Sequence, residues 1–367
     1  MPERTARWAR AAWEALWPPL AALALAFVVC GVIVAAIGAS PWVVLPMLFK
    51  QGLSSTDGFA RVLFDATPLI FTGLSVAYAF RAGLFNIGGE GQLYAGAFCA
   101  AAVALALPGA PRWIALPTAI VAAALGGGLW GAIPGWLKAR YGVHEVINTI
   151  MMNFLAVGIT GYLVERTLKE PDQMIPHTRA IAASYHLHPF ADSRLGAWLG
   201  LQSANPLGPS LLLALAAVLA VWAVLRWGVA GYRLRAVGEG PAAARQAGID
   251  VGRVTLRAMA VSGALAGLVG VHEVLLYRHR FLDNFSSGLG FLGIAVALMG
   301  KNHPLGVLLA ALLFGFLSTG ALEIDIFTDV PRELVVVLQA LIILFVVTIG
   351  ELAARRRRRL ARERGTR

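Results

Sequence analysis

The chain has 367 residues, of which 58% are hydrophobic and only 14% are charged. This composition excludes an ordinary soluble protein and indicates an integral membrane protein made of many helices. The formal net charge of +11 does not indicate nucleic-acid binding. The basic residues gather beside apolar segments, and no aromatic residues are interleaved with them to stack on bases.

Apolar segments along the chain predict an all-α integral membrane fold with about ten transmembrane segments. Several are near the ~20 residues needed to cross ~30 Å of hydrocarbon. The segment at 288–300 is too short to span alone, so we expect it to be broken or tilted. We expect the segments at about 20–38, 62–80, 90–107, 113–133, 145–164, 209–226, 258–276, 288–300, 304–322 and 332–350.

The basic residues predict how the chain is organised across the membrane, because short cytoplasmic segments carry an excess of Lys and Arg. Arginine and tryptophan alternate in residues 1–19, which we expect to form an amphipathic cytoplasmic arm at headgroup level. The transmembrane domain then covers 20–350, with a cytoplasmic loop at 227–257 and an extracytoplasmic loop at 165–208. The Arg-rich tail 351–367 is cytoplasmic and can touch anionic membrane lipid.

One stretch, Ala79 to Gly96, combines four closely spaced glycines with the polar residues Asn86, Glu90 and Gln92 between two long apolar segments. A carboxylate in hydrocarbon is costly, and backbone freed from a helix needs other hydrogen-bond partners. We therefore interpret this stretch as a broken helix that lines a route for something polar. The alternative is a cytoplasmic turn whose glycines merely permit tight bends.

A second Gly-rich interruption, Phe285–Gly306, lies at the corresponding position of the second half of the chain. Paired interruptions in two inverted five-helix halves predict a substrate site near the midplane of a transporter. Asn153 and Glu273 are further candidates for this route. Asn153 can equally bond a neighbouring helix, and Glu273 can equally be a structural acid held by His272 or by a helix neighbour.

Two non-membrane segments complete the expected topology on the outer side. Ser40 to Arg61 contains prolines and is expected to be a loop. The longer loop at 165–208 carries His177, His186 and His188. We take these histidines as solvated, because no carboxylate or cysteine spacing supports a metal site.

The cytoplasmic loop contains a short predicted helix. Pro241 stands at a helix N1 position and Gly248 provides the stop. A helix of about two turns is too short to be stable alone, so it needs a docking surface. The alternative is a connector resting on the membrane face. The predicted docking residues are Gly238, Glu239, Pro241, Ala242, Ala243, Ala244, Arg245 and Gly248.

Motifs for covalent chemistry are absent from the sequence. Gly300-Lys301 lacks the remainder of a phosphate-binding loop, and there is neither an HExxH motif nor a nucleophile elbow. We therefore expect no enzyme activity and no bound cofactor or metal. Active transport would draw its energy from an ion gradient or from a partner chain.

Four stretches together resemble the permease subunits of bacterial ABC importers for nucleosides and simple sugars. This group also contains ribose and branched-chain amino acid permeases. The resemblance covers roughly residues 60–325. The stretches are RAGLFNIGGEGQLYAG, GVHEVINTIMMNFLA, GYRLRAVGEGPAAARQAGI and FSSGLGFLGIAVALMGKNHPLG.

The resemblance implies a subunit of the bacterial cytoplasmic membrane, with both termini cytoplasmic. Gly238 through Gly248 would dock into an ABC ATPase subunit, which uses ATP and Mg. The other implied partners are a second permease, either a paralogue or a copy, and an extracytoplasmic substrate-binding protein. Two alternatives stay open: a self-sufficient ion-coupled transporter or channel with Glu90 and Glu273 as coupling carboxylates, and a membrane enzyme acting on lipid head groups.

Overall fold

The computed structural model describes residues 2–171, 173–328, 330–331 and 333–365. All the named secondary-structure elements in these described residues are helices. The side chains of residues 2–16, 19, 195, 354 and 356–365 lie outside this description. These include Trp8 and Trp13 of the expected arm and most of the basic tail. The chain divides into a larger unit, residues 56–315, and a smaller unit, residues 1–55 with 316–367.

The larger unit contains the interruptions and the expected docking helix. Long helices here alternate with short ones and with irregular segments. Its helices are α3 (Thr56–Arg81), α4 (Gly89–Ala106), α5 (Arg112–Tyr141), α6 (Glu145–Leu163), η1 (Val164–Leu168), η2 (Ala183–Tyr185), η3 (Phe190–Asp192), α7 (Arg194–Leu199), α8 (Ser210–Trp227), α9 (Val229–Glu239), α10 (Pro241–Gln246), α11 (Val251–Gly267), η4 (Val271–Arg278), α12 (Leu289–Met299) and the first half of α13 (Pro304–Phe327).

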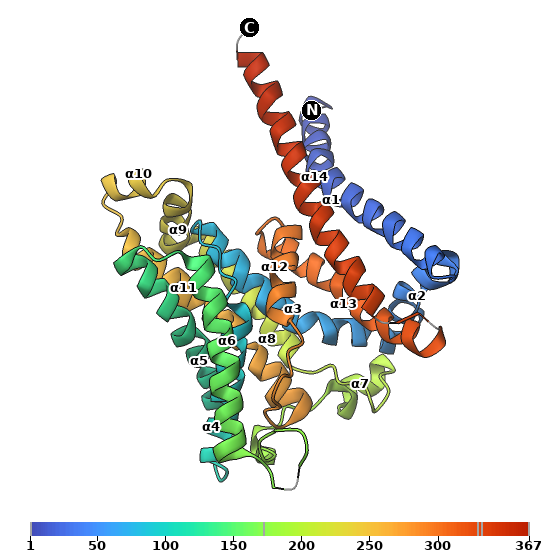
Figure 1. The fold of residues 1–367 in the computed structure, drawn as a ribbon, viewed down its shortest axis with the longest axis vertical. Helices are drawn as coiled ribbons and strands as arrows, with labels where there is room; N and C mark the ends of the chain where they lie inside the picture. The colour runs from blue at the N-terminus through green and yellow to red at the C-terminus, as the bar shows by residue number, and fades with distance from the viewer. Residues whose placement is uncertain (1, 172, 329, 332, 366–367) are drawn as a thin grey trace. The chain divides into compact units, whose positions relative to one another are not determined.

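Two helices form the centre of the larger unit. The most apolar window of α3 is 89% buried and that of α11 with η4 is 78% buried, whereas the corresponding window of α5 or α6 is 28% buried. The helices α4, α5, α6 and α11 lie beside one another (Figure 1). The outer helices expose apolar side chains such as Leu129 and Phe154, as expected for surfaces that contact lipid.

The α5–α11 contact depends on glycine residues in both helices. A Cβ atom on Gly127 would lie 2.3 Å from the Gly263 carbonyl oxygen, and one on Gly267 would lie 2.3 Å from the Ala123 carbonyl oxygen. A Cβ atom on Gly96 of α4 would lie 2.3 Å from the Gly267 Cα. Small residues let helix backbones approach this closely, which is the usual basis of helix association in a bilayer.

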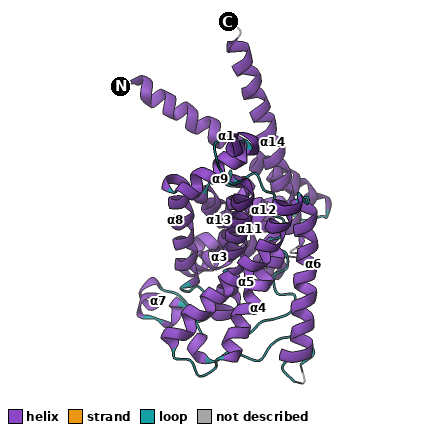
Figure 2. Cartoon of the chain, turned by 90° about the vertical axis from the view of Figure 1, so that its left-hand side faces the viewer, coloured by secondary structure: helices purple, strands orange, loops and turns teal. Residues whose placement is uncertain are grey.

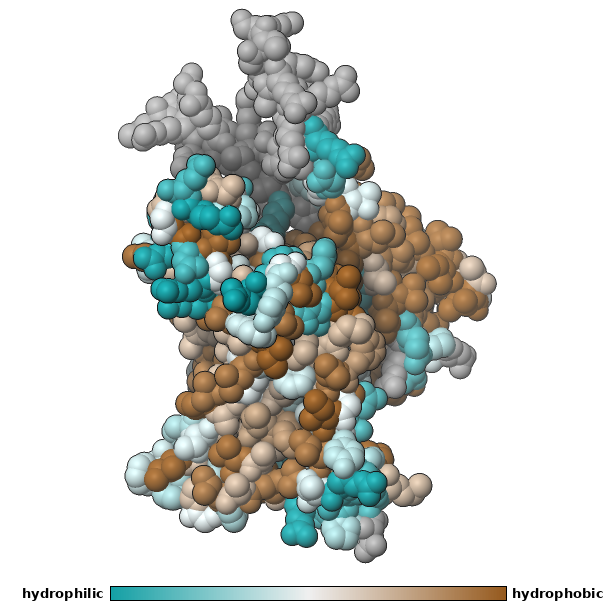
Figure 3. Space-filling model, turned by 60° about the vertical axis from the view of Figure 1, so that its left-hand side comes forward, coloured by the Kyte–Doolittle hydropathy of each residue, from teal (hydrophilic) through white to brown (hydrophobic). Residues whose placement is uncertain are grey.

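The two ends of the larger unit are different in structure. Figure 2 shows α9 at one end of the helices and α7 at the other. At the α7 end, residues 165–208 fold back onto the helix ends: Leu187 N donates to the Leu275 carbonyl at 2.7 Å, and Tyr185 Oη donates to the Leu107 carbonyl at 3.1 Å. In the left-hand part of Figure 3, an apolar band separates two hydrophilic ends.

The smaller unit contains α1 (Pro2–Ala36), α2 (Pro41–Ser54), the end of α13, and α14 (Glu333–Gly365). Helices α1 and α14 pack side by side. The helix α1 continues without a break from the expected arm into the first apolar segment. The expectation of a loop from Ser40 to Arg61 is wrong: Pro41 occupies the first turn of α2, where its missing N–H costs nothing.

Seven helices are long and apolar enough to cross a membrane among the described residues. They are α3, α5, α6 with η1, α8, α11 with η4, α13 and the first part of α14. The segment expected to be too short is indeed the 11-residue helix α12. The larger total of about ten spans stays a prediction, because α4 and the apolar part of α1 do not meet the same criteria.

We predict that Gly127→Val destabilises the protein by about 1–3 kcal/mol, because the added methyl groups must force two backbones apart. The matched control is Gly158→Val on α6, where a Cβ atom meets nothing within 4 Å. The midpoint of thermal unfolding of the purified protein in detergent should fall for the first variant and stay near wild type for the second. Equal midpoints would contradict the close packing of α5 on α11.

Candidate functional site

The two Gly-rich interruptions, expected from separate halves of the sequence, meet inside the larger unit. The Gly290 N–H of α12 donates a hydrogen bond of 2.7 Å to Oε2 of Glu90 in the first turn of α4. A Cβ atom on Gly290 would lie 2.2 Å from the Glu90 backbone nitrogen. Only glycine permits this approach, so the N-terminal ends of two interrupted helices converge on one carboxylate.

Glu90 therefore acts as a cap for a helix other than its own. Its carboxylate also accepts hydrogen bonds from the Ser286 side chain and the Gly288 backbone, at the start of α12. The first N–H groups of a helix lack partners within the helix and carry a partial positive charge, which a carboxylate satisfies. Glu90 is 8% exposed, and this contact explains how a carboxylate is held in an apolar bundle.

Asn86 and Gln92 hold the first interruption together. The Asn86 amide donates to Gln92 Oε1 at 2.9 Å and to Ser262 Oγ on α11 at 2.8 Å, while its carbonyl oxygen accepts the Gly88 N–H. Ser262 Oγ in turn donates to the Ser75 carbonyl on α3 at 2.7 Å. Both amide side chains are 1% exposed. The network thus ties the interruption to the two central helices.

Asn153 of α6 supports the same interruption from the other side. Its oxygen accepts the Gly91 N–H at 2.8 Å, and its amide nitrogen donates to the Ile87 carbonyl at 2.9 Å. Both partners are backbone groups near the start of α4, which need partners in an apolar environment. Asn153 therefore makes hydrogen bonds to a neighbouring segment, which was the alternative role expected for it.

Glu273 is 7% exposed and is held by Arg278, whose Nε lies 3.0 Å from Oε2. Arg278 lies five residues further along the same helical segment, so this pairing matches the alternative of a structural acid held by a helix neighbour, while His272 Nδ1 lies 3.0 Å from Ser210 Oγ. Glu273 belongs to the π-helical segment η4. It does not join the hydrogen bonds of Asn86, Glu90 and Gln92.

Tyr94 lies beside the segment that leads into α12, and sequence reasoning missed it. Its hydroxyl oxygen accepts the Ser286 N–H at 3.4 Å, and its ring packs against Phe285 at 4.9 Å between centroids. Nothing in the sequence distinguished this tyrosine from other residues of the apolar run after the interruption. The structure therefore places a buried aromatic ring beside the start of α12.

The expected docking helix is present at the opposite end from α7. The helix α10 begins at Pro241 and ends after Gln246, and Gly248 adopts φ +78° just beyond it. Most of its residues are exposed, with Ala244 as the buried exception. Two expected members lie elsewhere: Gly238 and Glu239 form the last turn of α9, a helix that the sequence analysis did not predict.

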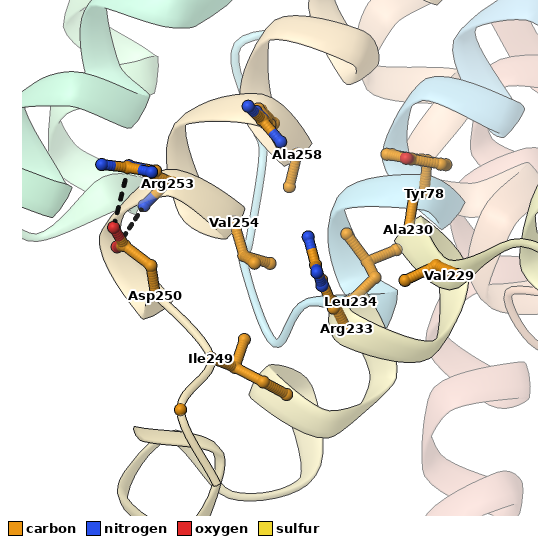
Figure 4. Close-up of a pocket in the computed structure, with 12 residues that line it drawn as sticks. Tyr78, Val229, Ala230, Arg233, Leu234, Ile249, Asp250, Arg253, Val254 and Ala258 are labelled. Carbon is orange, nitrogen blue, oxygen red and sulfur yellow. Dashed lines mark hydrogen bonds and ion pairs between the residues drawn. The ribbon is translucent and has the colours of Figure 1, made fainter. Parts of the chain in front are cut away.

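A pocket of about 420 Å³ lies beside α10, between α9 and the start of α11. Figure 4 shows Arg233 and Arg253 in this pocket, with Asp250 bonded to Arg253. Asp250 Oδ1 accepts the Arg253 N–H at 2.9 Å, and Oδ2 lies 3.0 Å from Arg253 Nε. Arg257 also lines the pocket. Beside an exposed short helix, these basic side chains form a surface suited to a partner chain with acidic residues.

The loop histidines are not all solvated, contrary to expectation. His177 is 8% exposed, and the His186 ring stacks on His279 with centroids 3.8 Å apart. Burial, and then the nearby charge of His186, lower the pKa of His279. His188 is exposed. Among the described residues, no group of three or more His, Cys, Asp or Glu side chains is arranged to hold a metal ion.

Several proteins similar to this chain are named as permeases of ABC transporters. The family described as branched-chain amino acid transport system, permease component, matches residues 58–347. The guanosine ABC transporter permease protein NupP of Bacillus subtilis is 44% identical over 286 residues, which are 77% of this chain and 78% of that protein. No solved structure matches the chain.

Two further relatives cover more of the chain. The nucleoside ABC transporter permease protein NupB of Lactococcus lactis is 35% identical, over 89% of each chain. The glucose ABC transporter permease protein TsgB13 of Haloferax volcanii is 34% identical, over 92% of this chain and 88% of that protein. The similarity therefore includes the interruptions, the central helices and α10.

We predict that Asn153→Ala lowers the free energy of unfolding by about 1–3 kcal/mol or more, because it leaves two buried backbone groups without partners. Asn148→Ala is the matched control on the same helix, since the Asn148 amide nitrogen is buried without a hydrogen-bond partner. Thermal unfolding in detergent should distinguish them. If Asn148→Ala is the more damaging change, the role given to Asn153 is wrong.

Proposed function

The chain belongs to the family of branched-chain amino acid transport system permease components, and we propose that it is the membrane-spanning permease subunit of an ABC importer for nucleosides or simple sugars. The observation that carries this proposal is the 44% identity to a permease named for guanosine. The glucose permease among the relatives keeps simple sugars within the proposed range.

The buried polar cluster supports a route for such molecules. A nucleoside or sugar presents hydroxyl groups that donate to carboxylates, and a nucleobase also stacks on aromatic rings. Glu90 offers a carboxylate, and Tyr94 and Phe285 offer aromatic rings, at the start of α12. We therefore propose that the substrate passes between the converging ends of α4 and α12, with Asn86, Gln92 and Asn153 holding the backbone in place.

The arrangement of the interruptions also supports two inverted halves. The helix α4 follows α3 and α12 follows η4, each after a non-helical stretch, and their N-terminal ends meet at Glu90. Helices that are interrupted in corresponding positions of inverted halves meet near the bilayer midplane in transporters. We propose the same depth for Glu90 and Gly290.

The energy source in this proposal is a separate ATPase subunit that uses ATP and Mg. The chain carries no phosphate-binding loop, so it is a transport subunit rather than an enzyme. Helix α10, exposed and basic at Arg245, is the proposed contact with that ATPase. A self-sufficient ion-coupled transporter is not favoured, because the relatives are named as permease proteins of ABC transporters.

The remaining proposed partners follow from the two ends of the larger unit. If α10 is cytoplasmic, the folded segment 165–208 faces outward, where a substrate-binding protein would dock. Both termini are then cytoplasmic, in the bacterial cytoplasmic membrane. A second permease, identical or paralogous, would complete the channel. The exposed apolar side chains of α6, such as Phe154 at 70% exposure, are available to this partner or to lipid.

The function is tested by uptake into vesicles that contain the permease, its ATPase and its binding protein. We expect ATP-dependent accumulation of a radiolabelled nucleoside, with guanosine as the first substrate to test and glucose as the second. Vesicles that lack the ATPase should show no accumulation. Uptake without the ATPase would contradict an ABC importer, and failure of every nucleoside and sugar would contradict the substrate class.

The docking role of α10 predicts that Gly248→Trp abolishes co-purification of the ATPase with the permease. Gly38→Trp is the matched control, because both glycines have positive φ, +78° and +85°, and both have open space around the position of a Cβ atom. The two changes therefore carry a similar backbone penalty of about 1–2 kcal/mol. Arg245→Glu, which alters charge without backbone strain, should also weaken co-purification. If both Gly248→Trp and Arg245→Glu retain the ATPase, α10 and the turn after it are not the contact with the ATPase.

A further inference from the structure

A second pocket, separate from the one beside α10, lies at the same end of the larger unit. It has a volume of about 140 Å³ and lies where the C-terminal ends of α3 and α8 meet α9 and the turn before α13. Its polar lining consists of Arg81, Arg226, Arg235 and His303, and Trp222 supplies an aromatic wall. No acidic residue is among the described residues that line it.

Two of the three arginines are positioned by backbone carbonyl groups rather than by carboxylates. Arg81 Nε donates to the Asn302 carbonyl at 3.0 Å, and Arg235 donates to the Leu225 carbonyl. Both guanidinium groups line the same pocket, so their like charges repel one another. Arg226 makes no side-chain hydrogen bond or ion pair within the described part of the chain. Each guanidinium group has five N–H donors, so most donors remain available to a ligand.

An anion with several oxygen atoms satisfies this arrangement. Guanidinium groups bind phosphate through two parallel hydrogen bonds, and a group of them without counter-charge favours a phosphate over a neutral ligand. The pocket beside α10 is less suited to an anion, because Asp250 forms an ion pair with Arg253, one of the arginines that line it.

The surroundings of the pocket identify the source of the phosphate. The outer surface of α8 exposes apolar side chains along its length, including Leu219 at 60% exposure, and leads directly to the pocket. Trp222 and Trp227 pack edge to face at the end of this helix, with centroids 4.7 Å apart. Tryptophan concentrates at headgroup level in membranes, and basic pockets between transmembrane helices bind anionic headgroups.

We propose that the pocket formed by Arg81, Arg226 and Arg235 binds the phosphate of an anionic phospholipid, whose acyl chains lie along the apolar surface of α8. Bound in this way, the lipid connects the ends of α3 and α8 with α9, the helix that leads into α10. The site is independent of which substrate the permease carries.

Native mass spectrometry of the full-length protein in detergent tests this site. The probes are phosphatidylglycerol, zwitterionic phosphatidylcholine and inorganic phosphate. Wild-type protein should bind phosphatidylglycerol more tightly than phosphatidylcholine, and inorganic phosphate should not displace the lipid. Arg226→Gln should weaken phosphatidylglycerol binding about fivefold, the effect of one basic residue near an anionic headgroup. This variant breaks no hydrogen bond among the described residues, so its fold should be unchanged.

Arg140→Gln is the control for general attraction to the membrane surface. Arg140 is exposed in the last turn of α5, near the exposed Trp136, but lines neither pocket at this end. Arg140→Gln should leave phosphatidylglycerol binding unchanged. Equal binding of the two lipids, or equal weakening by both variants, would overturn a specific pocket. Displacement of the lipid by inorganic phosphate would show a site for a soluble anion and would overturn the lipid assignment.

Discussion

The larger unit depends on one hydrogen bond between two chain segments 200 residues apart, from the Gly290 N–H to the Glu90 carboxylate. Backbone that leaves a helix within an apolar bundle must find polar partners. Glu90 satisfies the start of α12, and the amide groups of Asn86 and Asn153 satisfy the stretch before and at the start of α4. The glycines allow the two backbones to approach closely, and the polar side chains form hydrogen bonds with the backbone groups there. The convergence of the two helix ends follows from these contacts.

Much of the helical arrangement could be predicted, because apolar length is a local property of a membrane chain. The expected segment at 62–80 lies within α3, and the segment at 288–300 coincides with the short helix α12. The prediction of helices failed in segments that are not long apolar runs. Ser40 to Arg61 contains prolines and charged residues, yet α2 forms there because Pro41 suits a first helical turn. The helix α9 is rich in arginine and glycine, so its sequence did not distinguish it from a loop.

The candidate site could be predicted only in part. Asn86, Glu90 and Gln92 were recognisable because polar residues among glycines are unusual in an apolar chain. Their partners were not, since Ser262 lies 176 residues after Asn86 and occurs in a stretch suited to close packing. Tyr94 gave no signal of its own, and the burial of His177 results from strand-like pairing with Leu282. Contacts between distant segments are decided by packing, which a single sequence does not display.

The central claim is that the meeting point of α4 and α12 belongs to the transport route as well as to the fold. Glu90→Gln tests it most directly, because glutamine keeps an oxygen that accepts the Gly290 N–H but removes the charge. The measurement is ATP-dependent substrate uptake by vesicles that contain the complete complex. We expect uptake to fall well below wild type while thermal stability and ATPase co-purification are retained. Wild-type uptake by this variant would contradict the claim and leave Glu90 as a structural cap alone.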